Sequence, residues 1–103
     1  MYEIKKTTQF QKWFKNLKDI KAKARITLRL KSVSLGNFGD YKSLGQNLFE
    51  LRFFFGSGYR VYYTIKNNQV IFLLTGGDKS SQEKDIKQAK KLYEALEDNG
   101  YEN

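Results

Sequence analysis

The segment LFELRFFFGSGYRVYYTIKNNQVIFLLT, residues 48–75, is the part of this 103-residue chain that says most about its fold. It contains three runs rich in β-branched and aromatic residues, which are 48–55, 59–65 and 70–75. The tripeptide GSG separates the first two runs, and the tetrapeptide KNNQ separates the last two. Short turns of this kind between such runs predict an antiparallel meander of three strands. The third run is apolar at both odd and even positions, which indicates a buried central strand.

Helical spacing of apolar residues is found on both sides of the meander. A capping-box pattern at Thr8 and Gln11 opens a first predicted helix, and a second helix follows and ends near Gly36. Another capping box, Ser80 with Glu83, opens a third helix after the meander. The apolar stripes of the three helices are Phe10, Trp13, Phe14 and Leu17; Ala22, Ile26, Leu30 and Val33; and Ile86, Ala89, Tyr93 and Leu96.

These elements define the predicted fold class. A short edge strand is predicted at residues 2–4, and a polar loop at 37–47. The order is β–α–α–β–β–β–α, an α+β fold in which an N-terminal helical hairpin and a C-terminal helix pack on one face of a small, mostly antiparallel sheet. We expect residues 1–103 to form a single domain, because so short a chain has no room for a second core.

Composition excludes several kinds of site. The chain has neither cysteine nor histidine. This excludes a disulfide framework, thiolate metal sites and imidazole ligands or bases, and we expect no metal and no cofactor. Residues 1–8 lack the apolar run of a secretory signal, and no apolar run approaches the length of a membrane span. We therefore expect a cytoplasmic protein with no membrane partner.

Net charge is +8, and the excess lies before residue 46. Residues 1–45 carry eleven Lys or Arg against three Asp or Glu, whereas residues 46–103 carry eight of each. A basic half on a small domain indicates a polyanionic partner such as nucleic acid, although a solubilising surface explains the charge equally well. The candidate RNA-binding cations on the first two helices are Lys12, Lys15, Lys21, Arg25 and Arg29. The last three are spaced four residues apart and so form a ridge.

Strand parity groups charged residues on one side of the meander. Glu50 and Arg52 alternate with apolar residues in the first strand, as do Arg60 and Tyr62 in the second. With the apolar sides buried against the helices, these side chains are expected on an exposed face, and Lys79 emerges beside them after the third strand. One interpretation is a cross-strand ion-pair ladder. The other is an RNA site, where phosphates meet cations and bases stack on rings such as that of Tyr62.

The segment LLTGGDKSSQEKDI, residues 73–86, has the general appearance of a phosphate-binding turn. A P-loop requires a glycine directly before its lysine and a second glycine five residues before that one. Asp78 and Leu73 occupy these positions, so the P-loop interpretation fails. What remains is Lys79 beside a predicted helix N-terminus, a location that favours a phosphate or a developing negative charge.

Four motifs resemble the RelE/ParE superfamily of type II toxins, in its HigB-like, phage-type "addiction module killer protein" branch. They are LKDIKAKARI, LGNFGDYK, GYRVYY and LLTGGDKSSQEKDIKQAK. The similarity runs over residues 10–93 with the motifs in the same order, and GGDKSSQ followed by DI and AK is fairly specific to that branch. The resemblance implies a compact microbial-RNase-like fold, which agrees with the order of strands and helices predicted above.

The resemblance also implies an activity and partners. The activity is that of an mRNA interferase, an endoribonuclease that enters the ribosomal A site and cuts mRNA during translation. Cleavage of this kind is a metal-independent attack of a 2′-hydroxyl on the adjacent phosphate. The implied partners are the 70S ribosome, mRNA and a cognate HigA-like helix-turn-helix antitoxin. Operator DNA is bound only through the toxin–antitoxin complex.

Site residues follow from the resemblance one by one. Arg60, in GYRVYY, matches an arginine near the scissile phosphate, and Lys79 falls where relatives place Arg, Lys or His. Glu50 and Arg52 lie on the strand where relatives carry basic or acidic catalytic groups. We expect the arginines to stabilise the phosphorane charge, Glu50 to act as the base and Lys79 as the acid or a further stabiliser. The C-terminal tyrosine of some relatives has no match, because Tyr93 lies on an apolar stripe and is interpreted as core.

Two other functions stay open on sequence alone. ParE-like members of the superfamily poison DNA gyrase without nuclease chemistry, and a plain basic RNA-binding module would bind without arresting growth. The charged residues on the strands discriminate between these functions, because a nuclease needs them and a gyrase poison does not.

Overall fold

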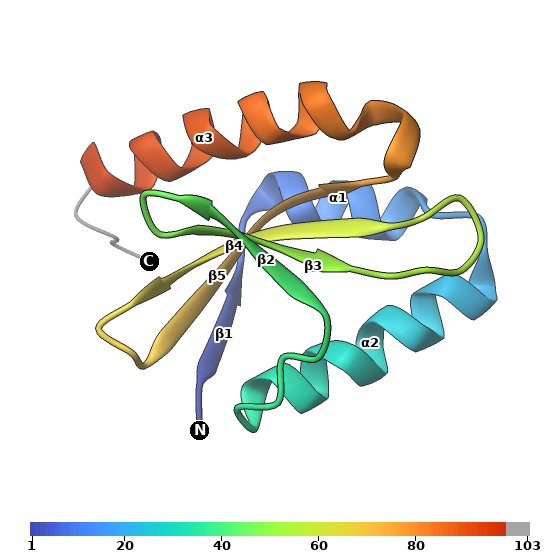
Figure 1. Ribbon diagram of the computed structural model, residues 1–103, viewed down its shortest axis with the longest axis horizontal. Coiled ribbons are helices and arrows are strands. Elements are labelled where there is room, and N and C mark those ends of the chain that lie inside the picture. The colour runs from blue at the N-terminus through green and yellow to red at the C-terminus, as the bar shows by residue number, and fades with distance from the viewer. Residues whose placement is uncertain (99–103) are drawn as a thin grey trace.

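The computed structural model describes residues 1–98, which form a five-stranded sheet with three helices (Figure 1). In chain order the elements are β1 (Glu3–Lys6), α1 (Thr8–Asn16), α2 (Ile20–Ser34), β2 (Tyr41–Gly45), β3 (Leu48–Arg52), β4 (Arg60–Lys66), β5 (Val70–Gly77), a 3₁₀ turn (Lys79–Ser81) and α3 (Gln82–Asp98). The predicted α+β class is confirmed. No helix among these residues is long and apolar enough to cross a membrane.

The sheet has the spatial order β1-β5-β4-β3-β2. Strands β3, β4 and β5 form the predicted antiparallel meander, and β2 pairs antiparallel with β3 at one edge. At the other edge β1 runs parallel to β5, with Glu3 opposite Val70. β5 is therefore an inner strand, and its side chains from Ile71 to Thr75 are buried, as the apolar run predicted.

The face covered by α1 and α2 holds the larger apolar core. Phe10 of α1 and Ile26 of α2 are buried there, together with Leu51 of β3 and Val61 of β4. Burial of each such side chain stabilises the fold by about 1.5–3 kcal/mol. The apolar stripes predicted for the first two helices thus face the sheet.

The opposite face is covered by α3, whose Ala89 is buried with Leu48 and Leu74. Figure 1 shows α3 and α2 on opposite sides of the sheet. The expectation that all the helices pack on one face is therefore wrong. Apolar periodicity identifies which side of a helix is buried, but not which face of the sheet it covers. Tyr93 packs at the margin of this second core, as its place on the stripe predicted.

Residues 37–47, predicted to be a loop, contain the edge strand β2. Its side chains are mostly exposed, so no apolar alternation marks it in the sequence. The strand forms because its backbone pairs with β3, where Lys42 lies opposite Glu50. Positive φ angles at Gln46 (52°) and Asn47 (64°) close the tight turn into β3.

The helix starts differ from the predicted caps by one or two residues. α1 is capped by Thr7 and not by Thr8. The Thr7 hydroxyl accepts the N–H of Phe10 at 3.0 Å and donates to a backbone carbonyl of β5 at 2.6 Å. Before α3, Asp78 caps the 3₁₀ turn in place of Ser80. Each cap lies where the chain leaves a strand or loop, so tertiary contacts select among neighbouring Ser, Thr and Asp residues.

Candidate functional site

The charged residues that parity groups together lie in two cross-strand rows at one end of the sheet. Arg52 of β3 pairs with Arg60 of β4, and Arg60 pairs with Gly77 of β5. In the next row Glu50 pairs with Tyr62. Because directly paired residues share a face, the four side chains lie on the face that α3 covers. We call Glu50, Arg52 and Arg60 the charged cluster.

The charged cluster is largely buried, which corrects the expectation of an exposed face. Relative exposure is 1% for Glu50, 3% for Arg60 and 0% for Tyr62. The cause is α3, which covers this face and removes these groups from water. Arg52 keeps 33% of its side chain exposed. The cluster therefore has an accessible side at Arg52.

Glu50 lies between the two arginines. Its Oε1 atom is 3.9 Å from Nε of Arg60 and 4.0 Å from Nε of Arg52. Its Oε2 atom accepts a hydrogen bond from Nε2 of Gln82 at 2.7 Å. A buried carboxylate is tolerated only where cations and donors compensate for the lost hydration. Gln82 therefore holds the Glu50 carboxylate from the first turn of α3.

Sequence reasoning missed Gln82 as a site residue. A signal was available, since Gln82 lies four residues before Ile86 and extends the apolar stripe of α3 by one turn. A polar amide at a position that faces the sheet requires a buried polar partner. That this partner is Glu50 depends on which face α3 covers, and periodicity does not carry that information.

Arg60 is held by backbone carbonyl groups. Its Nη1 atom donates to the carbonyl oxygens of Phe53, Gly58 and Tyr59 at 3.4, 3.3 and 3.2 Å. The Nε atoms of Arg52 and Arg60 are buried and have no hydrogen-bond acceptor among the described residues. Donors in this state favour an added anionic oxygen, and guanidinium groups bind phosphate well.

Tyr62 lies beneath α3, opposite Glu50. Burial, and after it the negative charge of Glu50, raises the pKa of the phenol above its ordinary value of 10.0. The hydroxyl is therefore protonated at neutral pH. Because the ring is fully buried, the predicted role of Tyr62 in stacking RNA bases requires α3 to move away.

Lys79 is exposed and lies against the turn that joins β3 to β4. Its backbone N–H donates to the carbonyl of Ser57 at 3.3 Å. A β-carbon at Gly58 would lie 3.3 Å from Cβ of Lys79 and 3.8 Å from Nη1 of Arg60, so both residues lie against this glycine. Lys79 thus lies at the margin of the charged cluster, as predicted from its position directly after the third strand of the meander.

The two glycines of the GGDKSSQ motif permit close packing. A β-carbon at Gly76 would lie 2.4 Å from ring atoms of Trp13. At Gly77 it would lie 1.7 Å from the Asp85 carboxylate. Neither approach tolerates a side chain, so this part of the motif brings α1 and α3 close to the end of β5.

Asp78 completes the motif by capping the turn into α3. Its Oδ1 atom accepts hydrogen bonds from the backbone N–H and the hydroxyl of Ser80 at 2.9 and 2.6 Å. The hydrogen bond from the Ser80 side chain is the main reason why the pKa of the Asp78 carboxyl is lowered. The motif is thus a packing and capping element, and Lys79 is its exposed cation.

The predicted basic surface is exposed over most of its residues. Lys12 and Lys15 on α1 and Lys21 on α2 are exposed. Arg25 is exposed too, with its guanidinium 4.7 Å from the centre of the Phe55 ring. These four cations form what we call the basic surface.

Arg29 is instead a clamp between α2 and the loop before β2. Its Nε atom donates to the carbonyl of Phe38 at 2.8 Å, and Nη2 donates to that of Asp40 at 2.6 Å. Its guanidinium lies 4.8 Å from the centre of the Phe53 ring, and burial lowers its pKa. The predicted ridge of three cations is therefore interrupted, because the Arg29 guanidinium is bonded within the protein whereas Arg25 is exposed.

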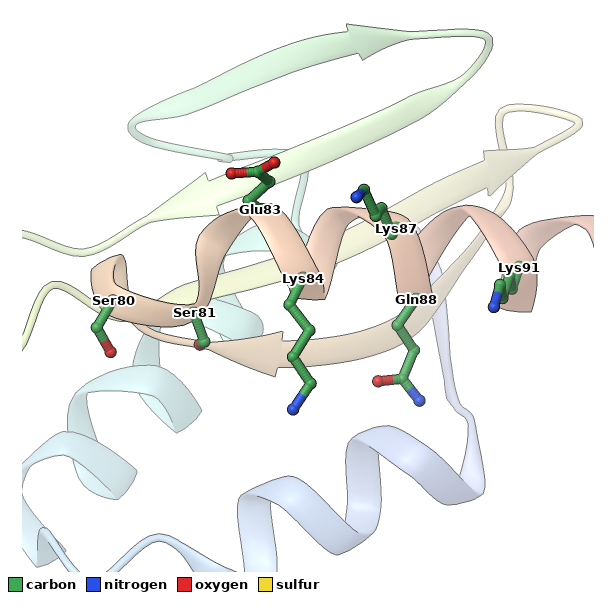
Figure 2. Close-up of a pocket in the computed structure, with 7 residues that line it drawn as sticks. All are labelled: Ser80, Ser81, Glu83, Lys84, Lys87, Gln88 and Lys91. Atoms are coloured by element: carbon green, nitrogen blue, oxygen red, sulfur yellow. The ribbon is translucent and has the colours of Figure 1, made fainter.

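A surface depression of about 710 Å³ runs along α3. Its lining residues are Ser80, Ser81, Glu83, Lys84, Lys87, Gln88 and Lys91 (Figure 2). Figure 2 shows Lys84 and Gln88 extending to the same side of the helix, while Glu83 points to the other side. No member of the charged cluster lines this depression, and we assign it no chemical role.

The architecture around the charged cluster is that of the RelE toxins. The isolated E. coli RelE toxin matches with a TM-score of 0.64 at 17% identity, over 85% of this chain and 98% of that chain. A chain of the intact E. coli RelBE toxin–antitoxin complex matches with a TM-score of 0.64 at 18% identity, over 76% of this chain and 96% of that chain. A mutant of E. coli RelE in the free state matches with a TM-score of 0.66 at 16% identity, over 87% of this chain and 96% of that chain. At such identities the likeness establishes the fold.

Sequence similarity defines the family. Residues 12–94 match the family described as phage derived protein Gp49-like (DUF891), and the chain belongs to this family. An uncharacterized protein of Haemophilus influenzae is 51% identical over 94 residues, which cover 91% of this chain and 95% of that protein. Family and fold together confirm the resemblance to the RelE/ParE superfamily that the motifs indicated.

Proposed function

We propose that this protein is the toxin of a type II toxin–antitoxin system and acts in the cytoplasm as a ribosome-dependent mRNA interferase. The observation that carries the proposal is the charged cluster, a carboxylate held between two guanidinium groups within a RelE-like fold. Burying such charges is costly, and apolar residues of similar volume often give equal or greater stability. We infer that the cluster is kept for chemistry.

The proposed reaction is attack of a ribose 2′-hydroxyl on the adjacent phosphorus, with departure of the 5′-oxygen. It leaves a 2′,3′-cyclic phosphate and a 5′-hydroxyl. Glu50 accepts the proton of the 2′-hydroxyl, and Lys79 donates a proton to the leaving oxygen or stabilises its charge. Arg52 and Arg60 stabilise the phosphorane. Each role falls to a side chain of this protein, so the mechanism needs no metal ion.

Access to the charged cluster is from the side of Arg52 and Lys79. Arg52 is one-third exposed and Lys79 is exposed, whereas Glu50 and Arg60 lie behind them. A phosphate that reaches Arg52 lies beside the inner pair, because Nε of Arg52 is 4.0 Å from Oε1 of Glu50. In this proposal the ribosome positions the RNA and supplies much of the rate, because correct orientation alone accounts for several kcal/mol of a barrier.

The proposed partners follow from the surface and the fold. The basic surface contacts ribosomal RNA. Neutralising its cations weakens ribosome binding and makes the binding constant depend less steeply on salt concentration. Arg29 is not included, because its Nε, Nη1 and Nη2 atoms all donate to backbone carbonyls. Arg60 differs, because its Nε atom has no acceptor among the described residues. A chain of this fold occurs in the RelBE toxin–antitoxin complex. We propose a cognate HigA-like helix-turn-helix antitoxin for this chain, with operator DNA bound only through the complex.

The burial of the charged cluster favours a second candidate. Glu50 is 1% exposed and Arg60 is 3% exposed, values that suit a purely structural ion pair. In that case the protein shares the toxin fold but acts as a poison of DNA gyrase, or binds RNA without cutting it.

A translation-dependent cleavage assay separates these candidates. Purified protein is mixed with programmed 70S ribosomes and labelled mRNA. The nuclease proposal expects cuts that require ribosomes and that fall about 10²-fold with Arg52→Met. Lys84→Met is the matched control, since Lys84 is exposed on α3 and lies outside the charged cluster. If a folded wild-type protein arrests growth and leaves mRNA intact, the nuclease proposal is wrong and gyrase supercoiling is assayed next.

A further inference from the structure

Phe54 lies in the turn between β3 and β4 and exposes 70% of its surface. Its neighbours Phe53 and Phe55 belong to the core on the opposite face of the sheet. Among the aromatic residues between positions 1 and 98, only Phe54 and Tyr41 are exposed. The Tyr41 ring packs against other aromatic rings, whereas Phe54 faces cations.

Two guanidinium groups face the Phe54 ring. The Cζ atoms of Arg52 and Arg60 lie 5.4 and 5.7 Å from its centre. Both arginines belong to the charged cluster, so the ring stands at the accessible side of that cluster. Cation–π contacts at exposed sites contribute about 0.5–1 kcal/mol. Burying a phenylalanine stabilises by about 1.5–3 kcal/mol, so stability alone does not favour this placement.

Shielding the ion pairs from water would be a simpler role for Phe54. An apolar side chain of similar size, such as leucine, provides that shield equally well. Stacking on a nucleobase requires a flat aromatic face, which leucine lacks and tyrosine or tryptophan has. The two roles therefore respond differently to substitution.

We propose that Phe54 is a stacking platform for an unpaired RNA base, beside the phosphate that Arg52 and Arg60 bind. The proposal rests on the proposed function, since it names a contact that the RNA makes at the charged cluster. A nucleotide uses both features, because its base covers the ring and its phosphate meets the cations. An apolar segment of a protein partner would use only the ring. Since every base has a flat face, this contact positions the RNA with little sequence preference.

Cleavage kinetics on programmed ribosomes test the platform. Phe54→Leu is expected to lower kcat/KM about 10- to 100-fold, while Phe54→Tyr and Phe54→Trp stay close to wild type. Tyr41→Leu, the matched change at the second exposed aromatic residue of the described part of the chain, leaves cleavage unchanged. Thermal melting of all four variants establishes that they are folded. Loss of activity that the aromatic variants do not restore would overturn the proposal.

A binding measurement makes the test independent of catalysis. The Phe54→Trp variant is titrated with a short 2′-O-methyl oligoribonucleotide, which cannot be cleaved. Stacking is expected to quench the new tryptophan, and an abasic oligonucleotide of equal length is expected not to. The wild-type protein, in which Trp13 packs against Gly76, supplies the background signal.

The two measurements separate failure of the platform from failure of the nuclease proposal. If wild type and Phe54→Leu cut mRNA equally fast, the platform is wrong and the proposed function stands. If the wild type cuts nothing, the proposed function is wrong. Tryptophan quenching in Phe54→Trp then shows by itself whether this position stacks on RNA bases. Quenching that needs the bases supports the platform, and its absence overturns it.

Discussion

The two faces of the sheet are built differently. Under α1 and α2, side chains such as Phe10 and Leu51 bury apolar surface against one another. Under α3, the apolar contacts of Leu48 and Ala89 share the face with buried Glu50 and Arg60. The first face stabilises the fold, whereas the second holds charges away from water at a cost in stability. The apolar core and the buried charges can lie on different faces because successive side chains of one strand point to opposite faces of the sheet.

Substitutions in β3 and β4 test whether the two faces of the sheet have different roles. Arg60→Met keeps the length of the side chain but removes the guanidinium, and we expect cleavage to fall about 10²–10³-fold. Leu51→Ala changes the other face and is expected to lower the free energy of unfolding by about 2–5 kcal/mol. Its cleavage rate, measured well below its melting temperature, should stay near wild type. Denaturant unfolding and single-turnover cleavage check both variants. Equal losses of cleavage in the two folded variants would contradict the separation of tasks.

Much of this arrangement could be predicted from the sequence. The alternation in β3 and β4 predicted that Glu50, Arg52, Arg60 and Tyr62 share a face, and the cross-strand register confirms it. Such alternation is local, so it survives whatever packs on the strands. The meander and the three helices were predictable for the same reason.

Three features were not predictable, because they depend on contacts between distant parts of the chain. The burial of Glu50 follows from α3 covering the second face, which helical periodicity does not specify. The bond from Gln82 to Glu50 exists only in that arrangement. β2 has a mostly exposed sequence and is a strand only through its pairing with β3.

A substitution in α3 tests how this helix contributes to the charged cluster, and its expected effect on cleavage is smaller. Gln82→Met removes the hydrogen bond to the Glu50 carboxylate, and bonds to charged groups contribute about 1.5–3 kcal/mol. As a positioning residue, Gln82 should affect kcat more than KM, and we expect kcat to fall about tenfold. Gln88→Met on the same helix is the control, because Gln88 lies outside the cluster. If Gln82→Met loses the stability of the hydrogen bond while its kcat stays at the wild-type value, Gln82 has a purely structural role.

The cap before α3 is expected to make a small, pH-dependent contribution to stability. Hydrogen bonds from Ser80 lower the pKa of Asp78 in the folded protein, so the unfolded chain binds this proton more tightly. The resulting stabilisation is present above the unfolded value, about 4, and is lost as pH falls through the lower folded value. Asp78→Asn should therefore lose less stability than wild type between about pH 5 and pH 2, by a small margin because the carboxyl is largely solvated. The check is to measure the melting temperatures of wild type and Asp78→Asn across that pH range. If the two plots of melting temperature against pH run parallel, the Asp78 carboxylate does not contribute.

If the charged cluster performs chemistry and is not only a pair of structural ion pairs, removal of the Glu50 charge must slow cleavage. The measurement is the rate at which Glu50→Gln cuts mRNA on programmed ribosomes. The glutamine oxygen can still accept the bond from Gln82, so the change removes the charge while preserving the shape. We predict a folded variant that binds ribosomes and cleaves at least about 100-fold more slowly than wild type. A folded variant that cleaves at the wild-type rate would show that the Glu50 carboxylate has no part in catalysis.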